Sequence, residues 1–401
     1  MNSKEAIIFL LILLLIPSIF AVSNVQHSID GNKINLTFQG TPPFWINIRG
    51  DKNIGQPGGY IWAKTNKDMF TIDLGFAINP SNLFYYGVKD AGWSSIGSFT
   101  RSDTISVAAI NLSYEEYALE NLQNKINSLM TNHPDVDLIV TPEYLFYGGG
   151  FAGLDYRNDP VIVNCQNSLC DIKSINTVKS NELKNIINAM QNIASKNNIN
   201  IVLGTIAEME EVSGTNFTFD TQLIIDRQGN IIGKHRMYPL VYPVGKNTNY
   251  CENNAVVCQQ AQDSILNTDI AFSLTNKQGI IFKIIPIICG EKNDDKVIAR
   301  LNNSNADFAV ISEFDVDCNY ELISKRIQSG ENIFENVPQF TCEWILKIVF
   351  DKWAANNLLK GGNIVVADGF VPSAGLFNFN LKPMQDLEIT EDYTYGKIEI
   401  S

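Results

Sequence analysis

The sequence is poor in histidine and in charged side chains. It contains three histidines, His27, His133 and His235, and no two stand at metal-ligand spacing, so a His-rich zinc site is not expected. Charged residues make up 18% of the chain, and 43 acidic residues against 30 basic ones give a formal charge of −13. Such a surface repels phosphate backbones, which argues against a nucleic-acid partner. The chain has no internal repeat, and its 401 residues with 45% apolar side chains suit one large domain plus a small one.

After its first 22 residues the sequence has no apolar run long enough to cross a bilayer. At the start, Lys4 precedes an apolar run over residues 6–16, Pro17 ends it, and Ala21 offers a small residue for cleavage. This run falls short of the roughly 20 residues that a spanning helix needs. Residues 1–22 are therefore predicted to be a signal peptide, with an uncleaved anchor as the alternative. The protein is expected to be secreted or otherwise extracytoplasmic, and any membrane attachment would come from this segment alone.

Six of the seven cysteines are close to one another in sequence and lie in polar, loop-like segments. An oxidising compartment permits disulfides, and proximity in sequence suggests three pairs: Cys165 with Cys170, Cys251 with Cys258, and Cys318 with Cys342. Six cysteines allow 15 pairings, so this connectivity is a hypothesis. The seventh, Cys289, ends the apolar run "IIFKIIPIICGE". A thiol kept apart from the others is either an inert buried cysteine or a nucleophile.

The pattern of apolar residues divides the chain into three parts. After the signal at 1–22, residues 23–101 consist of short apolar or alternating segments between Gly, Pro and Asn turns, which predicts a small β-sandwich. Ile34, Leu36 and Phe38 share one face of such a strand. Its aromatic residues favour a core over a ligand platform, although a surface-binding role stays open.

Residues 102–401 alternate apolar strands with amphipathic helices, which indicates an α/β fold. Helices are expected from about Tyr114 to Met130, from about Ser180, after Asn293, and from Glu343 to Ala355. Strands are expected in "ISVAAINL", "DLIVTPE", "INIVLGTIAE", "FTFDTQLIID", "NIIGKH", "DIAFSLT", "GIIFKIIPIICG", "ADFAVISEF" and "GNIVVADG".

Three chemically capable residues follow apolar strands, where α/β domains place their working groups. Glu143 ends "DLIVTPE", Lys234 follows "GNIIG", and Cys289 ends "IIPIIC". Each residue alone is weak evidence for a functional site, because a charged residue after a strand is usually solvated. Together, "TPEYLF", "TQLIIDRQGNIIGKHRMYPL" and "GIIFKIIPIICGE" resemble the glutamate, lysine and nucleophile motifs of the nitrilase, or carbon–nitrogen hydrolase, superfamily.

This resemblance implies a fold, a reaction and residue roles. The fold is an α-β-β-α sandwich, often dimerised, which predicts a possible homodimer. Cys289 would attack an amide carbonyl of a small-molecule substrate, Glu143 would act as general base, and Lys234 would stabilise the oxyanion. The backbone N–H of Gly290 would be a second oxyanion donor. This chemistry needs no cofactor and no metal. The expected function is a secreted amidase-type hydrolase acting on a non-peptide C–N bond through a thioester.

The sequence departs from the superfamily at two places. Most relatives carry an aromatic residue and then an acidic one after the cysteine, whereas this chain has Gly290 and then Glu291, which suggests a roomier pocket. Many relatives carry a second glutamate eight residues after the lysine, where this chain has Tyr242. Either Glu252 or Glu291 replaces that glutamate, or the site lacks the contribution that a second glutamate makes in relatives.

Several alternatives remain at this point. The departures leave room for a non-catalytic binding protein on the same scaffold, and an amine in place of water would make the enzyme an acyltransferase. A Cys–His protease using His235 is disfavoured, because His235 and its neighbour Lys234 point to opposite faces of an extended segment. The glycine-rich run at 143–151 is either a substrate lid or a plain surface turn.

Overall fold

The computed structural model describes most of the chain outside its N-terminal 22 residues. Contacts between its Cα atoms divide it into two compact units, the first ending at Asp103 and the second beginning at Thr104. The predicted signal at 1–22 and residues 144–151 of the glycine-rich run lie outside the described residues. The residues that the structure describes are 23–30, 33–39, 42–50, 60–73, 83–89, 94–100, 104–113, 118–143, 156–166, 169–246, 250–266, 271–301, 304, 306–314, 318–335, 337–339, 341–356, 358–369 and 373–400.

The first unit consists of two antiparallel sheets. One has the strand order β1-β2-β5, and the other β4-β3-β6-β7. The predicted face of β2 is its buried face, since Ile34, Leu36 and Phe38 are at most 2% exposed. The Phe38 ring meets Phe44 of the other sheet at a centroid distance of 4.7 Å, so the two sheets share a core. The strands are β1 (Ser23–Asp30), β2 (Lys33–Gln39), β3 (Phe44–Gly50), β4 (Tyr60–Thr65), β5 (Met69–Asp73), β6 (Leu83–Lys89) and β7 (Ser94–Thr100).

The second unit begins with a nine-stranded sheet of order β11-β10-β12-β9-β8-β21-β20, extended by β13 and β14 beside β12. Helices α3 (Leu119–Asn132) and α4 (Val178–Asn197) cover its outer face through their buried leucines and isoleucines. The strands are β8 (Thr104–Ile110), β9 (Leu138–Val140), β10 (Val161–Gln166), β11 (Leu169–Ser174), β12 (Asn200–Val212), β13 (Thr215–Ile225), β14 (Ile231–Pro243), β20 (Gln385–Ile389) and β21 (Tyr393–Glu399).

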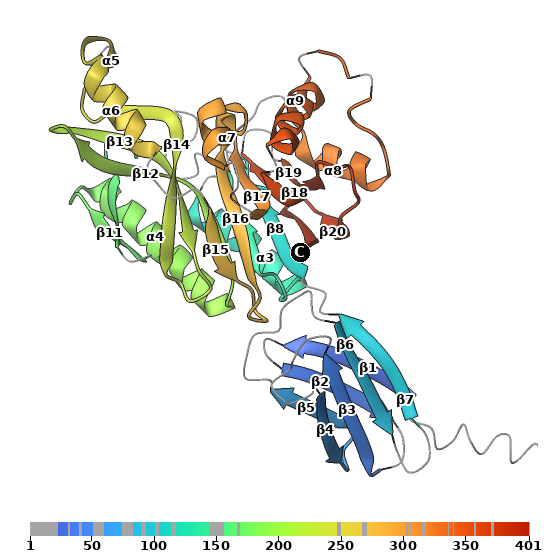
Figure 1. The fold of residues 1–401 in the computed structure, drawn as a ribbon. Helices are drawn as coiled ribbons and strands as arrows, with labels where there is room; N and C mark the ends of the chain where they lie inside the picture. Colours follow the sequence, from blue (N-terminus) through green and yellow to red (C-terminus); the bar gives the residue numbers. More distant parts are fainter. Residues whose placement is uncertain are drawn as a thin grey trace, which may run out of the picture. The chain divides into compact units, whose positions relative to one another are not determined.

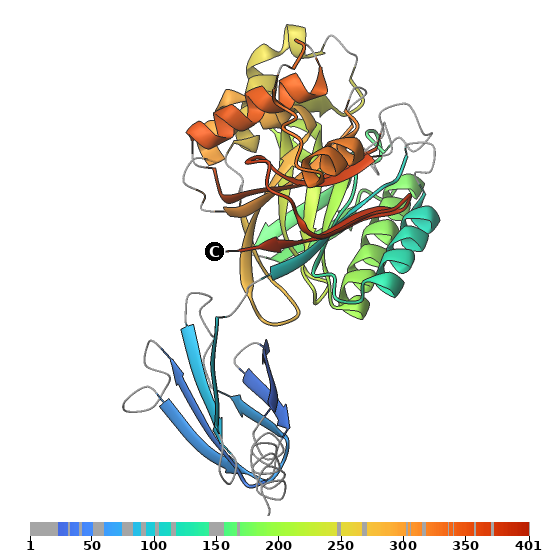
Figure 2. The same ribbon diagram turned by 90° about the vertical axis from the view of Figure 1, so that its right-hand side faces the viewer.

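A five-stranded sheet of order β15-β16-β17-β18-β19 packs on the inner face of the first. Its strands are β15 (Phe272–Thr275), β16 (Ile281–Ile288), β17 (Ala306–Glu313), β18 (Leu359–Asp368) and β19 (Ser373–Asn378). Its outer helices are α6 (Ala255–Ile265), α7 (Asp295–Leu301), α8 (Tyr320–Gln328) and α9 (Cys342–Ala355), joined by the short α5 (Tyr250–Asn253). Figures 1 and 2 show the resulting four layers, an α-β-β-α sandwich, as the resemblance implies.

The helix boundaries show where the sequence was misleading. Within the described residues the first helix begins at Leu119, later than the expected Tyr114. The second helix is capped by Thr177, whose side chain accepts from the N–H of Ser180 at 3.1 Å. Ser180, expected as the cap, is instead buried and donates to the carbonyl of Pro160 at 2.6 Å. None of the described helices has the length and apolar character required to cross a membrane.

All three expected disulfides are present. Cys165–Cys170 links the paired strands β10 and β11, Cys251–Cys258 links α5 to α6, and Cys318–Cys342 ties the start of α8 to the start of α9. The hairpin β10–β11 and the helices α5, α6 and α8 were not expected, because their polar sequences were interpreted as loops. Cys289 is the cysteine that stays free.

Candidate active site

The predicted site residues gather where the inner strands end. Strands β16, β17 and β18 run parallel, so their carboxyl ends lie at one edge of the sheet. Cys289 follows β16 directly, and Glu313 ends β17. Glu143, three residues after β9 of the other sheet, reaches the same edge because its N–H donates to the carbonyl of Glu313 at 3.4 Å. The Ser312 hydroxyl donates to the carbonyl of Thr141 at 2.7 Å, which fastens the two sheets there.

Cys289 occupies a sharp turn between its strand and a single turn of 3₁₀ helix, η2 (Cys289–Asn293). Its φ of 44° lies in the left-handed region that non-glycine residues rarely adopt, and such strain clusters at functional sites. The surrounding structure holds the turn: Glu291 accepts from the N–H of Ile288 at 2.9 Å, and the Trp353 indole donates to the carbonyl of Lys292 at 2.9 Å. The thiol is thereby fixed in a half-buried position.

Glu143 and Cys289 act directly on each other. The Glu143 carboxyl is completely buried and lies close enough to the thiol for each group to shift the pKa of the other. Burial, followed by the negative charges of Asp220 and Glu313, raises the pKa of Glu143 well above its usual value. Burial and the Glu143 carboxylate likewise raise the pKa of Cys289. The resting thiol is therefore neutral, and a base with increased proton affinity lies next to it.

Asp220 on β13 completes a carboxyl pair with Glu143. Its carboxyl is completely buried, which raises its pKa to about 8, and its negative charge in turn raises the pKa of Glu143. Two carboxyls this close cannot both ionise without large cost, so the pair shares one proton. The sequence gave no reason to single out Asp220, because it lies inside the strand segment "FTFDTQL" rather than at its end.

Replacing Asp220 with asparagine is expected to change the pH dependence of stability. The folded protein keeps the Asp220 proton at pH values where the unfolded chain has lost it. This contribution is complete below the ordinary pKa of 3.8 and is lost as the pH rises through the raised folded pKa. Asparagine cannot ionise, so the melting temperature of the Asp220→Asn variant should fall less between about pH 5 and about pH 8 than that of the wild type. If the melting temperatures of both proteins change by the same amount over this range, the carboxyl pair does not share a proton.

The structure does not bring Lys234 to this pair. Its ammonium donates to the carbonyl of Val163 at 2.7 Å and forms an ion pair with buried Glu208. In the β13–β14 ladder Lys234 is opposite Leu223, which belongs to the core under α3 and α4. The neighbouring pair, Gln222 and His235, faces the other way, since Gln222 donates to Ser312 of the inner sheet at 2.7 Å.

Lys234 instead lies on the wall of a second cavity. This cavity of about 640 Å³ is lined by β10, the C-terminal part of β12, and the residues Lys234 and Arg236. Burial lowers the pKa of Lys234, while Glu208 opposes that shift. The oxyanion role expected for this lysine therefore does not fit its position on the outer face of β14.

His235 and Glu291 form a buried link between β14 and the cysteine turn. His235 Nε2 lies 2.7 Å from Glu291, and the Glu291 carboxylate also accepts from the N–H of Tyr238 at 2.7 Å. His235 was correctly placed on the opposite face from Lys234, yet that face is the one toward the cysteine turn. Glu291 thus positions the turn through three hydrogen bonds.

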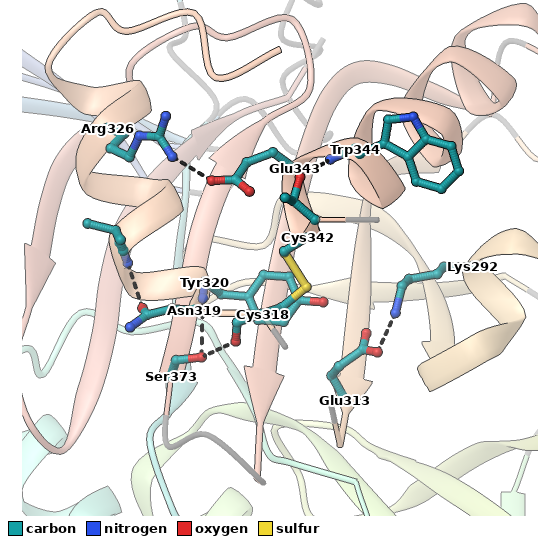
Figure 3. Close-up of a disulfide and its surroundings, with 12 residues drawn as sticks. Lys292, Glu313, Cys318, Asn319, Tyr320, Arg326, Cys342, Glu343, Trp344 and Ser373 are labelled. Carbon is teal, nitrogen blue, oxygen red and sulfur yellow. Dashed lines mark hydrogen bonds and ion pairs between the residues drawn. A yellow bond between two sulfur atoms is a disulfide. The ribbon is translucent and has the colours of Figure 1, made fainter. Parts of the chain in front are cut away.

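A lysine that the sequence analysis overlooked lies beside the reacting pair. Lys292 is 6% exposed and forms an ion pair with Glu313, also buried (Figure 3). Its positive charge lowers the pKa of both Cys289 and Glu143, against the larger effect of burial. A signal was available, since an acidic residue and a lysine directly after an apolar strand end are unusual unless paired.

Tyr242, Glu252 and Gly290 complete the set of predicted residues. Tyr242 is 37% exposed, and its ring lies 5.8 Å from the Arg157 guanidinium. Glu252 is an exposed residue of α5. Gly290 directly follows Cys289 and is exposed, and among the described residues a Cβ built on it would meet no atom within 4 Å. Among the described residues, no group of His, Cys, Asp and Glu is arranged to hold a metal ion.

The comparison with protein families agrees with this fold. Residues 106–335, more than half of the chain, match the family described as Carbon-nitrogen hydrolase. The protein belongs to this family, and thus to the nitrilase superfamily, whose α/β sandwich it has. Among curated proteins, none is significantly similar in sequence.

Solved structures of the superfamily are similar to the chain at low identity. Nit3 of Saccharomyces cerevisiae, from branch 10 of the nitrilase superfamily, is 16% identical, with 74% of this chain and 90% of that chain covered and a TM-score of 0.43. An amidase from Nesterenkonia sp. is 11% identical, with 75% and 91% covered and a TM-score of 0.42. A carbon–nitrogen hydrolase from Helicobacter pylori G27 is 12% identical, with 74% and 89% covered and a TM-score of 0.41.

Proposed function

We propose that this protein is an extracytoplasmic amidase-type hydrolase that cleaves a non-peptide amide through a thioester on Cys289. The observation that carries the proposal is the placement of the Cys289 thiol beside the buried Glu143 carboxyl, where each group shifts the pKa of the other. A neutral thiol attacks an amide poorly, and a carboxylate in contact with it can accept its proton as the sulfur–carbon bond forms. Three disulfides support an oxidising compartment, hence secretion or N-terminal anchoring.

The proposed reaction has two halves that share one base. Glu143 takes the thiol proton while Cys289 attacks the carbonyl carbon, and then passes that proton to the leaving amine as the C–N bond breaks. Water next attacks the thioester while Glu143 accepts its proton, and the acid departs as the thiol is restored. An amine in place of water would make the same site an acyltransferase.

A panel of simple linear amides, assayed for release of ammonia or amine, tests the proposal. Wild type should hydrolyse at least one of them, and Cys289→Ala should reduce the rate to background. Equal rates of amide hydrolysis in wild type and Cys289→Ala would contradict the proposed enzyme and favour a binding protein on the same scaffold. Added hydroxylamine separates the two reactions: an acyltransferase forms product only when such an acceptor is present.

The open space at Gly290 predicts which amides are accepted. Gly290→Tyr restores the aromatic residue common in relatives, and its side chain would fill the space beside the thiol. Amides with bulky acyl groups should lose roughly tenfold or more in kcat/KM relative to acetamide. Gly290→Ala, whose Cβ meets no neighbour, is the control and should leave this ratio nearly unchanged. Equal losses for small and bulky amides in the tyrosine variant would place the acyl pocket elsewhere.

A further inference from the structure

Lys292 belongs to the same short turn as the thiol. It is three residues after Cys289 in η2 and is buried, and its charge lowers the pKa of Cys289. The turn is fastened at that point from outside, because the Trp353 indole donates to the Lys292 carbonyl and the Lys352 ammonium donates to the Asn293 carbonyl at 3.0 Å. The side chain of Lys292 is thereby held in the buried cluster.

The ion pair with Glu313 keeps the Lys292 ammonium charged in that cluster. Glu313 ends β17, and its carbonyl accepts from the N–H of Glu143, so the counter-ion is built into the same strand edge as the base. An opposite charge in contact favours the charged form of a buried lysine. The charge of Lys292 lowers the pKa of both Cys289 and Glu143, opposing the negative charge of Glu313, which raises both.

Lys234 does not have these properties. It lies on the outer face of β14, committed to Glu208 and the Val163 carbonyl. Its charge is not among the main influences on Cys289 or Glu143.

We propose that Lys292, rather than Lys234, is the catalytic lysine of this protein, and that its ammonium stabilises the oxyanion formed on the carbonyl oxygen. The inference rests on the proposed thioester chemistry. As the Cys289 sulfur bonds to the carbonyl carbon, the electron pair of the C=O bond moves to oxygen and the thiol proton moves to Glu143. When the C–N bond breaks, that pair returns to the carbonyl and the proton goes to the leaving nitrogen. Lys292 keeps its own proton throughout and acts by charge alone.

Lys292→Met and Lys234→Met are a matched pair of variants for testing this assignment. Each removes one ammonium and keeps an unbranched apolar stem. With an amide that wild type hydrolyses, Lys292→Met should lower kcat/KM by about 10² to 10³, as loss of an oxyanion donor does. Lys234→Met should stay within about tenfold, because its partner Glu208 retains Arg236. The reverse order of losses would overturn the assignment.

A substrate-free readout separates this inference from the proposed function. Cys289 is alkylated with iodoacetamide against pH, and the modified peptide is quantified by mass spectrometry. Loss of the Lys292 charge should raise the thiol pKa and slow alkylation, whereas Lys234→Met should leave the profile unchanged. If Cys289→Ala hydrolyses amides as wild type does, the proposed function fails, while the alkylation result still reports on the lysines. Unchanged alkylation in Lys292→Met would contradict its place beside the thiol.

A double variant guards against misfolding. Lys292→Met combined with Glu313→Gln removes both charges of the buried pair, so no charge is left unpaired. If the single variant unfolds, the double variant should fold, as circular dichroism would report, and its kcat/KM should still be lower than that of wild type by about 10² to 10³, because the oxyanion charge is missing. A folded double variant that hydrolyses the amide at the wild-type rate would overturn the assignment. Lys292→Arg keeps the charge and should recover part of the wild-type rate.

Discussion

Glu143→Gln is expected to lower kcat/KM for amide hydrolysis by about 10² to 10⁴, the range that general-base catalysis contributes. Glutamine keeps the size and hydrogen-bonding capacity of the side chain but cannot accept the Cys289 proton. Burial is the largest cause of the raised pKa of Cys289 and persists in this variant, so the thiol stays almost entirely protonated at neutral pH. Without the base, attack depends on the rare thiolate.

The pH dependence of kcat/KM shows whether Glu143 is the general base. A base must be deprotonated to act, and the pKa of Glu143 is raised well above 4.5 by burial and neighbouring carboxylates. Wild-type kcat/KM should therefore rise with pH through a limb displaced upward from that of an ordinary glutamate, and glutamine should abolish that limb. Glu252→Gln, on exposed α5, is the matched control with an unchanged profile. A Glu143→Gln enzyme within tenfold of wild type would assign the base elsewhere.

Glu208→Gln is expected to destabilise the protein by about 3 to 5 kcal/mol, the cost of breaking a buried ion pair. Glu208 is fully buried and accepts from Arg236 Nε at 2.8 Å and from Lys234. These partners hold its pKa below the usual value although burial alone would raise it. Removing the carboxylate leaves two cations in the interior with less compensation. The melting temperature should fall by roughly 6 to 12 °C, and urea titration should give the free energy.

Glu210→Gln is the matched control for this stability prediction. Glu210 pairs with the same Arg236, but its side chain is 44% exposed. An exposed ion pair contributes no more than about 1 kcal/mol, so this variant should melt within a few degrees of wild type. Equal losses in the two variants would show that the Lys234–Glu208–Arg236 group is not a buried structural unit.

The sequence was sufficient to predict an α/β fold because its central strands are apolar, and the resemblance to the nitrilase superfamily implied the four layers. "IIFKIIPII" and "ADFAVISE" are continuous apolar runs, as strands buried on both faces require. The disulfides were also predictable, since close spacing in polar segments is a local property. The β10–β11 hairpin was not, because its sequence "NCQNSLC" is polar and its pairing depends on contacts with β12.

The structure brings Glu143 and Cys289 together but leaves Lys234 apart from them, and the reason is geometric. Glu143 and Cys289 follow strand ends, and a strand end reaches the working edge whatever the strand's rotation. Lys234 lies within strand β14, where side chains alternate between faces and a one-residue change in register exchanges them. Nothing in "GKHRMYPL" decides whether Lys234 or His235 faces inward. The ladder with β13 decides it, because Gln222 opposite His235 hydrogen-bonds to the inner sheet.

Lys292 was overlooked because its role depends on a turn rather than on a motif. The left-handed φ of Cys289 and the following 3₁₀ turn set where Lys292 lies relative to the thiol. Sequence alone indicated neither feature, since a helix was expected only after Asn293.

The most direct test of the central claim, that Cys289 is a nucleophile activated by Glu143, is alkylation with iodoacetamide under non-reducing conditions across pH, with every cysteine mapped by peptide mass spectrometry. We expect Cys289 alone to be labelled in wild type, at a rate that levels off once Glu143 is ionised. In Glu143→Gln the rate should be lower at neutral pH and should keep rising with pH as the thiolate forms. A Cys289 that stays inert while the other six cysteines react would be a buried structural thiol, and both the proposed catalysis and the three disulfides would be contradicted together.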